Sequence, residues 1–107
     1  MSKERGDTKA REIRVQAGEF IAREANRNAL ITPTRVELSP DMKKAVVYFT
    51  VLPETQEEEA LSFLQRKRSE FRAFLTSRRF RRIPLVDFQI DLGEKNRRAI
   101  DAIDTIN

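Results

Sequence analysis

The chain has no cysteine, no histidine and only three glycines among its 107 residues. Without thiols or imidazoles it can form no disulfide and no zinc site with the usual ligands, and it lacks the common near-neutral general base. The glycines lie far apart, which excludes the glycine-rich loops that hold phosphates in nucleotide-binding folds. The closest carboxylates, Glu57 to Glu59 and Asp87 with Asp91, have no nucleophile or metal-ligand spacing beside them. These absences predict a protein that is not an enzyme and that needs no cofactor.

Long apolar runs are missing as well. No segment approaches the roughly 20 apolar residues of a membrane span, and the opening stretch MSKERGDTKAREIR has no apolar block of a signal peptide. We therefore expect a cytoplasmic chain with no membrane partner. The length predicts one domain with a single modest core. Its expected parts are a flexible N-terminus over residues 1–9, the domain over residues 10–104 and a C-terminal end over residues 105–107.

Apolar periodicity predicts a helix followed by a β-hairpin. Apolar residues three and four positions apart indicate an amphipathic helix that follows a polar, frayed segment at residues 1–8 and runs to about Asn26. From Leu30 the period changes to two, with Thr32, Thr34, Val36 and Leu38 on one side of a strand, and a hairpin is expected from about residue 31. A Ser-Pro-Asp turn then leads into a β-branched run that ends at residue 52. Pro33 cannot donate a ladder hydrogen bond, so the first strand is expected to begin irregularly.

A second helix should follow, and its apolar stripe is interrupted. Thr55 to Glu58 form a T-x-x-E capping box, and Leu64 and Phe71 lie in phase on one helix face. Between them a straight helix would place Lys67 or Arg68 beneath the core, which costs several kcal/mol for an unpaired charge. We therefore predict a break near residues 66–70, with Ser69 as the N-cap of a second segment that ends at about Ser77.

A last strand is expected over residues 83–92, followed by a tail with enough apolar residues for a short docking helix but without a strong cap. Those apolar residues are Ala99, Ile100, Ile103 and Ile106. The order helix, strand, strand, interrupted helix, strand predicts a two-layer α+β domain with helices on one face of a three-stranded sheet.

Positive charge is concentrated in one segment. The net charge is +4, yet residues 66–82 alone carry eight basic side chains and one acidic side chain, so the rest of the chain is mildly acidic. Seven of the eight are arginine, whose planar fork suits phosphate and stacks on bases. A solvated helix face and a basic helix end account for only part of this excess, which favours contact with nucleic acid. Phe71 and Phe74 are in phase with Leu64 and predict core packing, whereas Phe80 is open to core packing or to base stacking.

Several segments resemble ribosome-binding factor A. The stretch ITPTRVELSPDMKKAVVYFTVL, residues 31–52, is similar to the family pattern I-T-V-T-x-V-x-V-S-P-D-L-x-x-A-x-V-Y-V-x-V-L. Phe71-Arg72, Arg81, Ile83-Pro84 and the strand from Phe88 to Asp91 resemble its F-I-R…L-R-x-x-P-x-L-x-F-x-x-D segment, and Arg98 to Asp101 resemble its R-I-D ending. The chain departs from the family where glycines are usual, at the break in Arg66 to Glu70 and after the second segment in Leu75 to Ser77.

The resemblance implies a KH-like (type II) fold, in the order α-β-β-α-(kink)-α-β with a three-stranded sheet. It also implies a non-catalytic, monomeric assembly factor that binds the immature small ribosomal subunit and its 16S rRNA, assists late maturation and supports growth in the cold. Carried over by position, the RNA-binding residues are Arg66, Lys67, Arg68, Ser69, Arg72, Arg78, Arg79, Arg81 and Arg82, with Lys43 and Lys44 as secondary candidates.

Two other readings of the basic segment stay open. One keeps the KH-like module but gives it a different RNA target. The other makes the chain a protein-interaction module that docks an acidic ribosomal partner. Whether the basic residues of the N-terminus join the contact is also open; these are Lys3, Arg5, Lys9 and Arg11.

Overall fold

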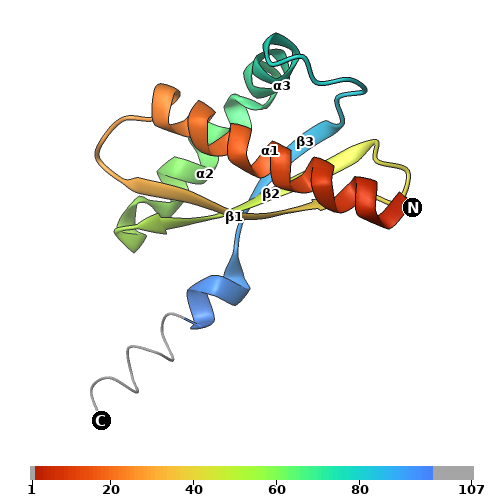
Figure 1. The fold of residues 1–107 in the computed structure, drawn as a ribbon. Helices are drawn as coiled ribbons and strands as arrows, with labels where there is room; N and C mark the ends of the chain where they lie inside the picture. Colours follow the sequence, from red (N-terminus) through yellow and green to blue (C-terminus); the bar gives the residue numbers. More distant parts are fainter. Residues whose placement is uncertain (1, 98–107) are drawn as a thin grey trace.

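The computed structural model describes residues 2–97, which form a mixed three-stranded sheet with helices packed on it (Figure 1). Strand β2 lies in the centre, antiparallel to β1 and parallel to β3. This arrangement confirms the predicted KH-like α+β fold. In chain order the elements are α1 (Ser2–Glu24), β1 (Leu30–Leu38), β2 (Lys44–Leu52), the 3-10 turn η1 (Glu54–Gln56), α2 (Glu57–Arg66), α3 (Arg68–Ser77) and β3 (Leu85–Ile90).

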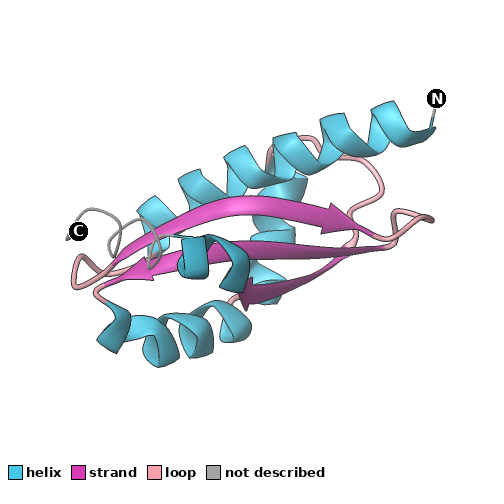
Figure 2. Ribbon diagram, turned by 90° about the horizontal axis from the view of Figure 1, so that it is seen from below, coloured by secondary structure: helices cyan, strands magenta, loops and turns pink. Residues whose placement is uncertain are grey.

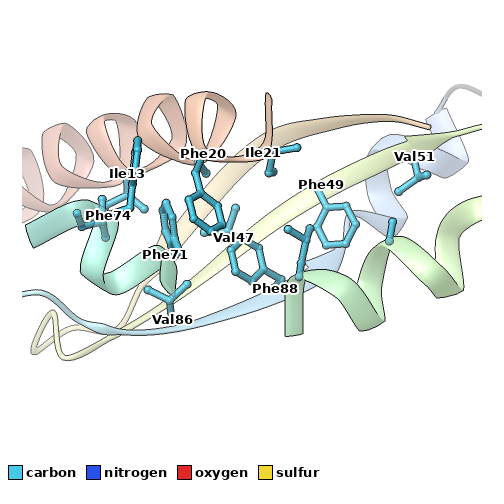
Figure 3. Close-up of a cluster of buried hydrophobic side chains, with 14 residues drawn as sticks. Ile13, Phe20, Ile21, Val47, Phe49, Val51, Phe71, Phe74, Val86 and Phe88 are labelled. Carbon is cyan, nitrogen blue, oxygen red and sulfur yellow. The ribbon is translucent and has the colours of Figure 1, made fainter. Parts of the chain in front are cut away.

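Helices α1, α2 and α3 cover one face of the sheet. Helix α1 packs against β1 and β2, while α2 and α3 pack against β3. Seen from below, the strands lie in front of α1 (Figure 2). Side chains from all three helices meet β2 and β3 in a single core (Figure 3). A layer of this kind buries the apolar stripe of each helix at once, which fits the single modest core expected from the chain length.

Aromatic rings form the middle of this core. Phe20 of α1 contacts both Phe71 and Phe74 of α3, with ring centroids 5.2 and 5.5 Å away. Phe71 also contacts Phe88 of β3 at 5.6 Å. Phe71 and Phe74 are thus core residues, as their spacing predicted, and Phe80 is partly buried against the same cluster.

The predicted break is present and consists of one residue. Lys67 separates α2 from α3 with φ −96° and ψ 7°, so the bend needs no glycine. Leu64 before the bend and Phe71 after it are both fully buried. The Lys67 side chain lies over the Phe63 ring at 5.6 Å and is 29% exposed, so its charge is kept out of the core.

Both predicted helix caps are wrong. The Lys67 carbonyl already accepts a hydrogen bond from the Phe71 amide, so α3 begins at Arg68 and Ser69 lies inside its first turn. The short break therefore leaves no extended residue at which a serine could cap. Helix α2 is entered through η1, and neither element has a side-chain cap hydrogen bond, so the box at Thr55 does not form.

The first helix is longer than predicted. It begins at Ser2, whereas residues 1–8 were expected to fray, and it ends at Glu24. Tertiary contacts explain the difference, because the Lys9 ammonium donates to the carbonyls of Arg81 (3.3 Å) and Arg82 (2.8 Å) and Gly6 lies beside Met42. These contacts stabilise turns that sequence periodicity alone does not support.

Strand β1 is irregular at Pro33, as expected, but its sidedness was only partly predicted. A bulge lies between Pro33 and Arg35, so the alternation shifts by one residue and Thr32 is exposed. Strand β3 is shorter than the expected 83–92, and residues 92–97 are helical. The rest of the expected docking helix, with Ala99 and Ile100, lies outside the described residues.

Candidate nucleic-acid interface

The predicted basic residues fall into two groups at opposite ends of α3. Helix α3 has 10 residues, which at 1.5 Å per residue separate the groups by about 15 Å. The break cluster comprises Arg66, Lys67, Arg68 and Ser69. The loop cluster comprises Arg78, Arg79, Arg81 and Arg82 and lies between α3 and β3.

The break cluster is largely paired within the molecule. The Lys67 ammonium lies 3.0 Å from the Glu70 carboxylate, and the Arg68 guanidinium lies 3.6 Å from the Asp87 carboxylate. Burial raises the pKa of Asp87, but hydrogen bonds from Gln89 and Gln65 and the charge of Arg68 lower it below its usual value overall. Asp87 is therefore ionised near neutrality and offsets Arg68. The break presents less free positive charge than its sequence indicated.

Arg66 and Ser69 complete the break cluster. The Arg66 guanidinium donates to the Ser62 hydroxyl at 2.7 Å, on the exposed side of α2. Ser69 is exposed in the first turn of α3. Both side chains are accessible to a ligand, but Ser69 is not the helix N-cap that the sequence predicted.

Arg72 lies apart from both clusters. Its guanidinium donates to the carbonyls of Pro84 at 3.0 Å and Ile83 at 3.4 Å, and the residue is half-buried. These hydrogen bonds satisfy carbonyls just before β3 and hold that segment against α3. Arg72 therefore has a structural task that its place in the sequence motif did not reveal.

The loop cluster begins with a Schellman ending of α3. The Phe80 amide donates to the Leu75 carbonyl at 3.1 Å and the Arg79 amide to the Thr76 carbonyl at 3.0 Å, which leaves Arg79 with φ 65°. Arg82 also has positive φ, 52°. These arginines stand in the backbone conformation in which glycine is the usual residue, and all four arginines of the cluster are exposed.

Arg78, the first residue of this cluster, is engaged on both sides of its guanidinium. That group lies 3.2 Å from the Glu19 carboxylate and 4.8 Å from the centroid of the Phe74 ring. Both partners belong to the layer formed by α1 and α3, so Arg78 links the loop to the helices.

A groove of about 890 Å³ lies between the loop cluster and the N-terminal half of α1. Its cationic lining residues come from both segments, and Glu12 is the one acidic residue in the lining. The Lys9 ammonium joins the two sides through its hydrogen bonds to the loop carbonyls. Such a concentration of one charge creates a positive potential suited to a polyanion. The cations are Arg5, Lys9, Arg11, Arg78, Arg79 and Arg81.

Sequence reasoning left the N-terminal cations undecided. Arg5 and Lys9 are four residues apart, a spacing that places them on one helix face, but the helix was expected to begin after them. The structure extends α1 to Ser2 and so brings Arg5, Lys9 and Arg11 beside the loop cluster.

The secondary candidates flank the loop cluster. Lys43 shares a groove of about 610 Å³ with Lys9 and Arg82, next to the acidic Asp41. Lys44 is exposed at the start of β2, paired in register with Leu85. The hairpin turn thus adds to the basic surface beside the loop.

No helix within residues 2–97 combines the length and apolar character needed to cross a membrane.

Comparisons with known proteins agree on one family. The family model for ribosome-binding factor A matches residues 5–103. The crystal structure of ribosome-binding factor A from Thermus thermophilus is 30% identical and superposes with a TM-score of 0.67, over 76% of this chain and 90% of that one. The solution NMR structure of a Thermotoga maritima protein assigned as a ribosome binding factor A is 27% identical, with a TM-score of 0.65 over 77% and 82% of the two chains. A comparison with curated protein sequences found no match. The chain therefore belongs to the ribosome-binding factor A family.

Proposed function

We propose that this chain is a non-catalytic assembly factor that binds the immature small ribosomal subunit through its 16S rRNA and assists late maturation in the cytoplasm. Three observations support the proposal. The family model covers nearly the whole chain, and the similar Thermus thermophilus protein is named for binding the ribosome. The basic loop and groove supply a surface for RNA. We further propose that the chain acts as a monomer and that its task matters most in the cold.

The groove between α1 and the loop cluster carries the proposal. Six cationic side chains line it against one acidic side chain, and most are arginines whose forks match phosphate oxygens. Arg79 and Arg81 are exposed at its edge. We assign the main RNA contact to this groove, with Arg82 and Lys43 beside it. The break cluster contributes less, because Lys67 and Arg68 have acidic partners in the same chain.

Co-sedimentation with purified small subunits tests this assignment. The double variant Arg79→Glu/Arg81→Glu should weaken binding by more than about tenfold, because each charged hydrogen bond to phosphate contributes roughly 1.5–3 kcal/mol. Arg23→Glu/Arg27→Glu is the matched control. It makes the same change in net charge at the C-terminal end of α1 and in the turn that follows, and it should bind nearly as well as wild type. Equal losses in the two variants would mean that net charge, and not the groove, controls binding.

The same assay separates RNA binding from docking on an acidic protein. Wild-type protein should be retained by 16S rRNA stripped of ribosomal proteins, since the proposed contact is with phosphate and bases. Capture that survives ribonuclease digestion of the subunit, together with no binding to stripped rRNA, would contradict the proposal and favour a protein partner.

A further inference from the structure

Gln16 places an unpaired acceptor in the lining of the basic groove. Its Oε1 atom is buried and has no hydrogen-bond partner among the residues that the structure describes. Gln16 lies on α1 and lines the groove together with residues of the loop cluster. Buried acceptors in folded proteins are nearly always paired, so the Gln16 side chain would gain a hydrogen bond by turning toward a ligand in the groove that brings a donor.

The groove also has apolar surface beside its cations. Val15 of α1 is 50% exposed although it is β-branched and apolar, and it lines the groove with Phe80. Phe80 is anchored by packing against the core and by the hydrogen bond from its amide to the Leu75 carbonyl. Fixed apolar side chains of this kind give a flat, uncharged ring system a surface on which to pack.

The cations, the apolar side chains and the Gln16 acceptor call for a ligand with a phosphate, a flat apolar ring and an N–H donor. A nucleotide whose base is unpaired has all three groups. The groove volume of about 890 Å³ lies within the range of roughly 300–1,000 Å³ that is typical of ligand sites. We propose that this groove binds one unpaired nucleotide of single-stranded RNA. The base packs against Val15 and Phe80, and the Gln16 side chain turns toward it so that Oε1 accepts an N–H of the base. The flanking phosphates contact Arg79 and Arg81. This inference rests on the proposed RNA-binding function and adds that the site holds a base as well as the backbone.

An acidic peptide fits the groove less well. Its carboxylates would match the cations, but they only accept hydrogen bonds, so a donor to Gln16 Oε1 would have to come from the peptide backbone and not from the groups that the cations attract. Its side chains would also place little flat apolar surface against Val15 and Phe80. The nucleotide satisfies all three features with one covalent unit.

Modified oligonucleotides test the proposal on the full chain by fluorescence anisotropy. The probes are short abasic ribose-phosphate strands that carry one central adenosine, one central purine riboside, or no base. Purine riboside keeps the ring but lacks the exocyclic amine. Wild type should bind the adenosine strand about fivefold more tightly than the purine riboside strand, the effect of one neutral hydrogen bond. Purine riboside should in turn bind at least about fivefold more tightly than the abasic strand, the effect of packing one base.

Gln16→Met isolates the hydrogen bond, because methionine has a similar shape and no amide oxygen. This variant should bind the adenosine and purine riboside strands equally, with unchanged affinity for the abasic strand. Its thermal midpoint should equal or exceed that of wild type, since an unpaired buried acceptor is removed. Gln89→Met, an exposed change on β3, is the matched control and should keep the preference for adenosine.

Each contrary result is specific. Equal wild-type affinity for all three strands, with binding to small subunits retained, would overturn the base site and leave the proposed function standing. If wild type bound the adenosine and purine riboside strands equally but the abasic strand more weakly, the base site would stand and Gln16 would have no role in it. Competition by an oligoglutamate peptide as effective as that of the adenosine strand would make the groove a protein-docking site. Loss of binding to all strands and to 16S rRNA would instead contradict the proposed function itself.

Discussion

Arg79 and Arg82 hold backbone angles that glycine adopts at less cost. Their φ values are 65° and 52°, in the left-handed region where a side chain crowds the following carbonyl. Arg79 occupies the position after the helix end that a Schellman motif gives to glycine. Arginine at this position lowers the stability of the fold, but it places a guanidinium in the lining of the groove.

Arg79→Gly should separate these two effects. The free energy of unfolding should rise by about 0.5–1 kcal/mol, because glycine removes the left-handed strain at a small entropic cost. Binding to the small subunit should weaken, since a groove cation is lost. Urea denaturation and co-sedimentation measure the two quantities. Arg78→Gly is the control, because φ at Arg78 is −95°. It should lower stability, and an increase in stability for both variants would contradict the strain at Arg79.

Elements were predicted well where apolar side chains decide the structure. The hairpin, the last strand and the break between α2 and α3 follow from spacing, since each alternative would bury a charge or expose an apolar stripe. The cap at Ser69 was wrong because Lys67 alone separates α2 from α3 and is the N-cap of α3. The box at Thr55 was wrong because α2 is entered through η1, which contains Thr55. The exposure of Thr32 could not be predicted, because it depends on the bulge between Pro33 and Arg35, and that bulge is defined by the pairing of β1 with β2.

Asp91 links β1 to the helical residues 92–97, a contact that was not predicted from the sequence. It is 4% exposed, and its carboxylate accepts hydrogen bonds from the Thr34 hydroxyl of β1 and from the Glu94 amide, 3.0 Å away, at the start of the helical residues 92–97. Lys95 of the same helical segment lies 3.0 Å from Glu57 of α2. Asp91 thus caps a helix for which no strong cap was predicted.

Asp91 also makes stability depend on pH. Burial raises its pKa, but the Thr34 hydroxyl, the Glu94 amide and Arg35 together lower it below its usual value. A carboxylate whose pKa is lower in the folded chain stabilises the fold above its unfolded pKa of about 3.9. That contribution is lost as the pH falls through the folded pKa.

Asp91→Asn should therefore flatten the loss of stability below about pH 4, while retaining an oxygen that can cap. Asp91→Ala should in addition lower the free energy of unfolding at pH 7 by about 1–2 kcal/mol through loss of the cap. Urea denaturation at several pH values measures both effects. An acid limb that is as steep in Asp91→Asn as in wild type would show that other carboxylates, such as Asp87 and Asp41, carry the pH dependence.

The candidate site could be predicted only in part, because it is assembled by the whole molecule. The basic segment 66–82 was visible in the sequence, but the partners of its cations were not. Lys67 and Arg68 of the break cluster are paired with Glu70 and with Asp87 of β3, whereas in the loop cluster Arg78 is paired with Glu19 of α1. The groove joins Lys9 to carbonyls more than 70 residues away. A contact over this sequence separation cannot be predicted from local residue patterns. Gln16 was not predicted either, because it has no charge that would indicate a ligand-binding residue.

The division of charge leads to a prediction about salt. Neutralising about five phosphates of a single-stranded RNA should make log K fall with log salt at a slope near −3.5. Arg79→Gln/Arg81→Gln removes two groove cations and should reduce the magnitude of the slope by about 1.4, whereas Lys67→Gln/Arg68→Gln should change it less. The reason is that Glu70 and Asp87 already neutralise the break, so fewer counterions leave the RNA when it binds there. Anisotropy titrations over a range of salt concentrations measure the slopes. A larger change for the Lys67 and Arg68 variant would move the main contact from the loop to the break, and a wild-type slope near zero would exclude an electrostatic contact at either place.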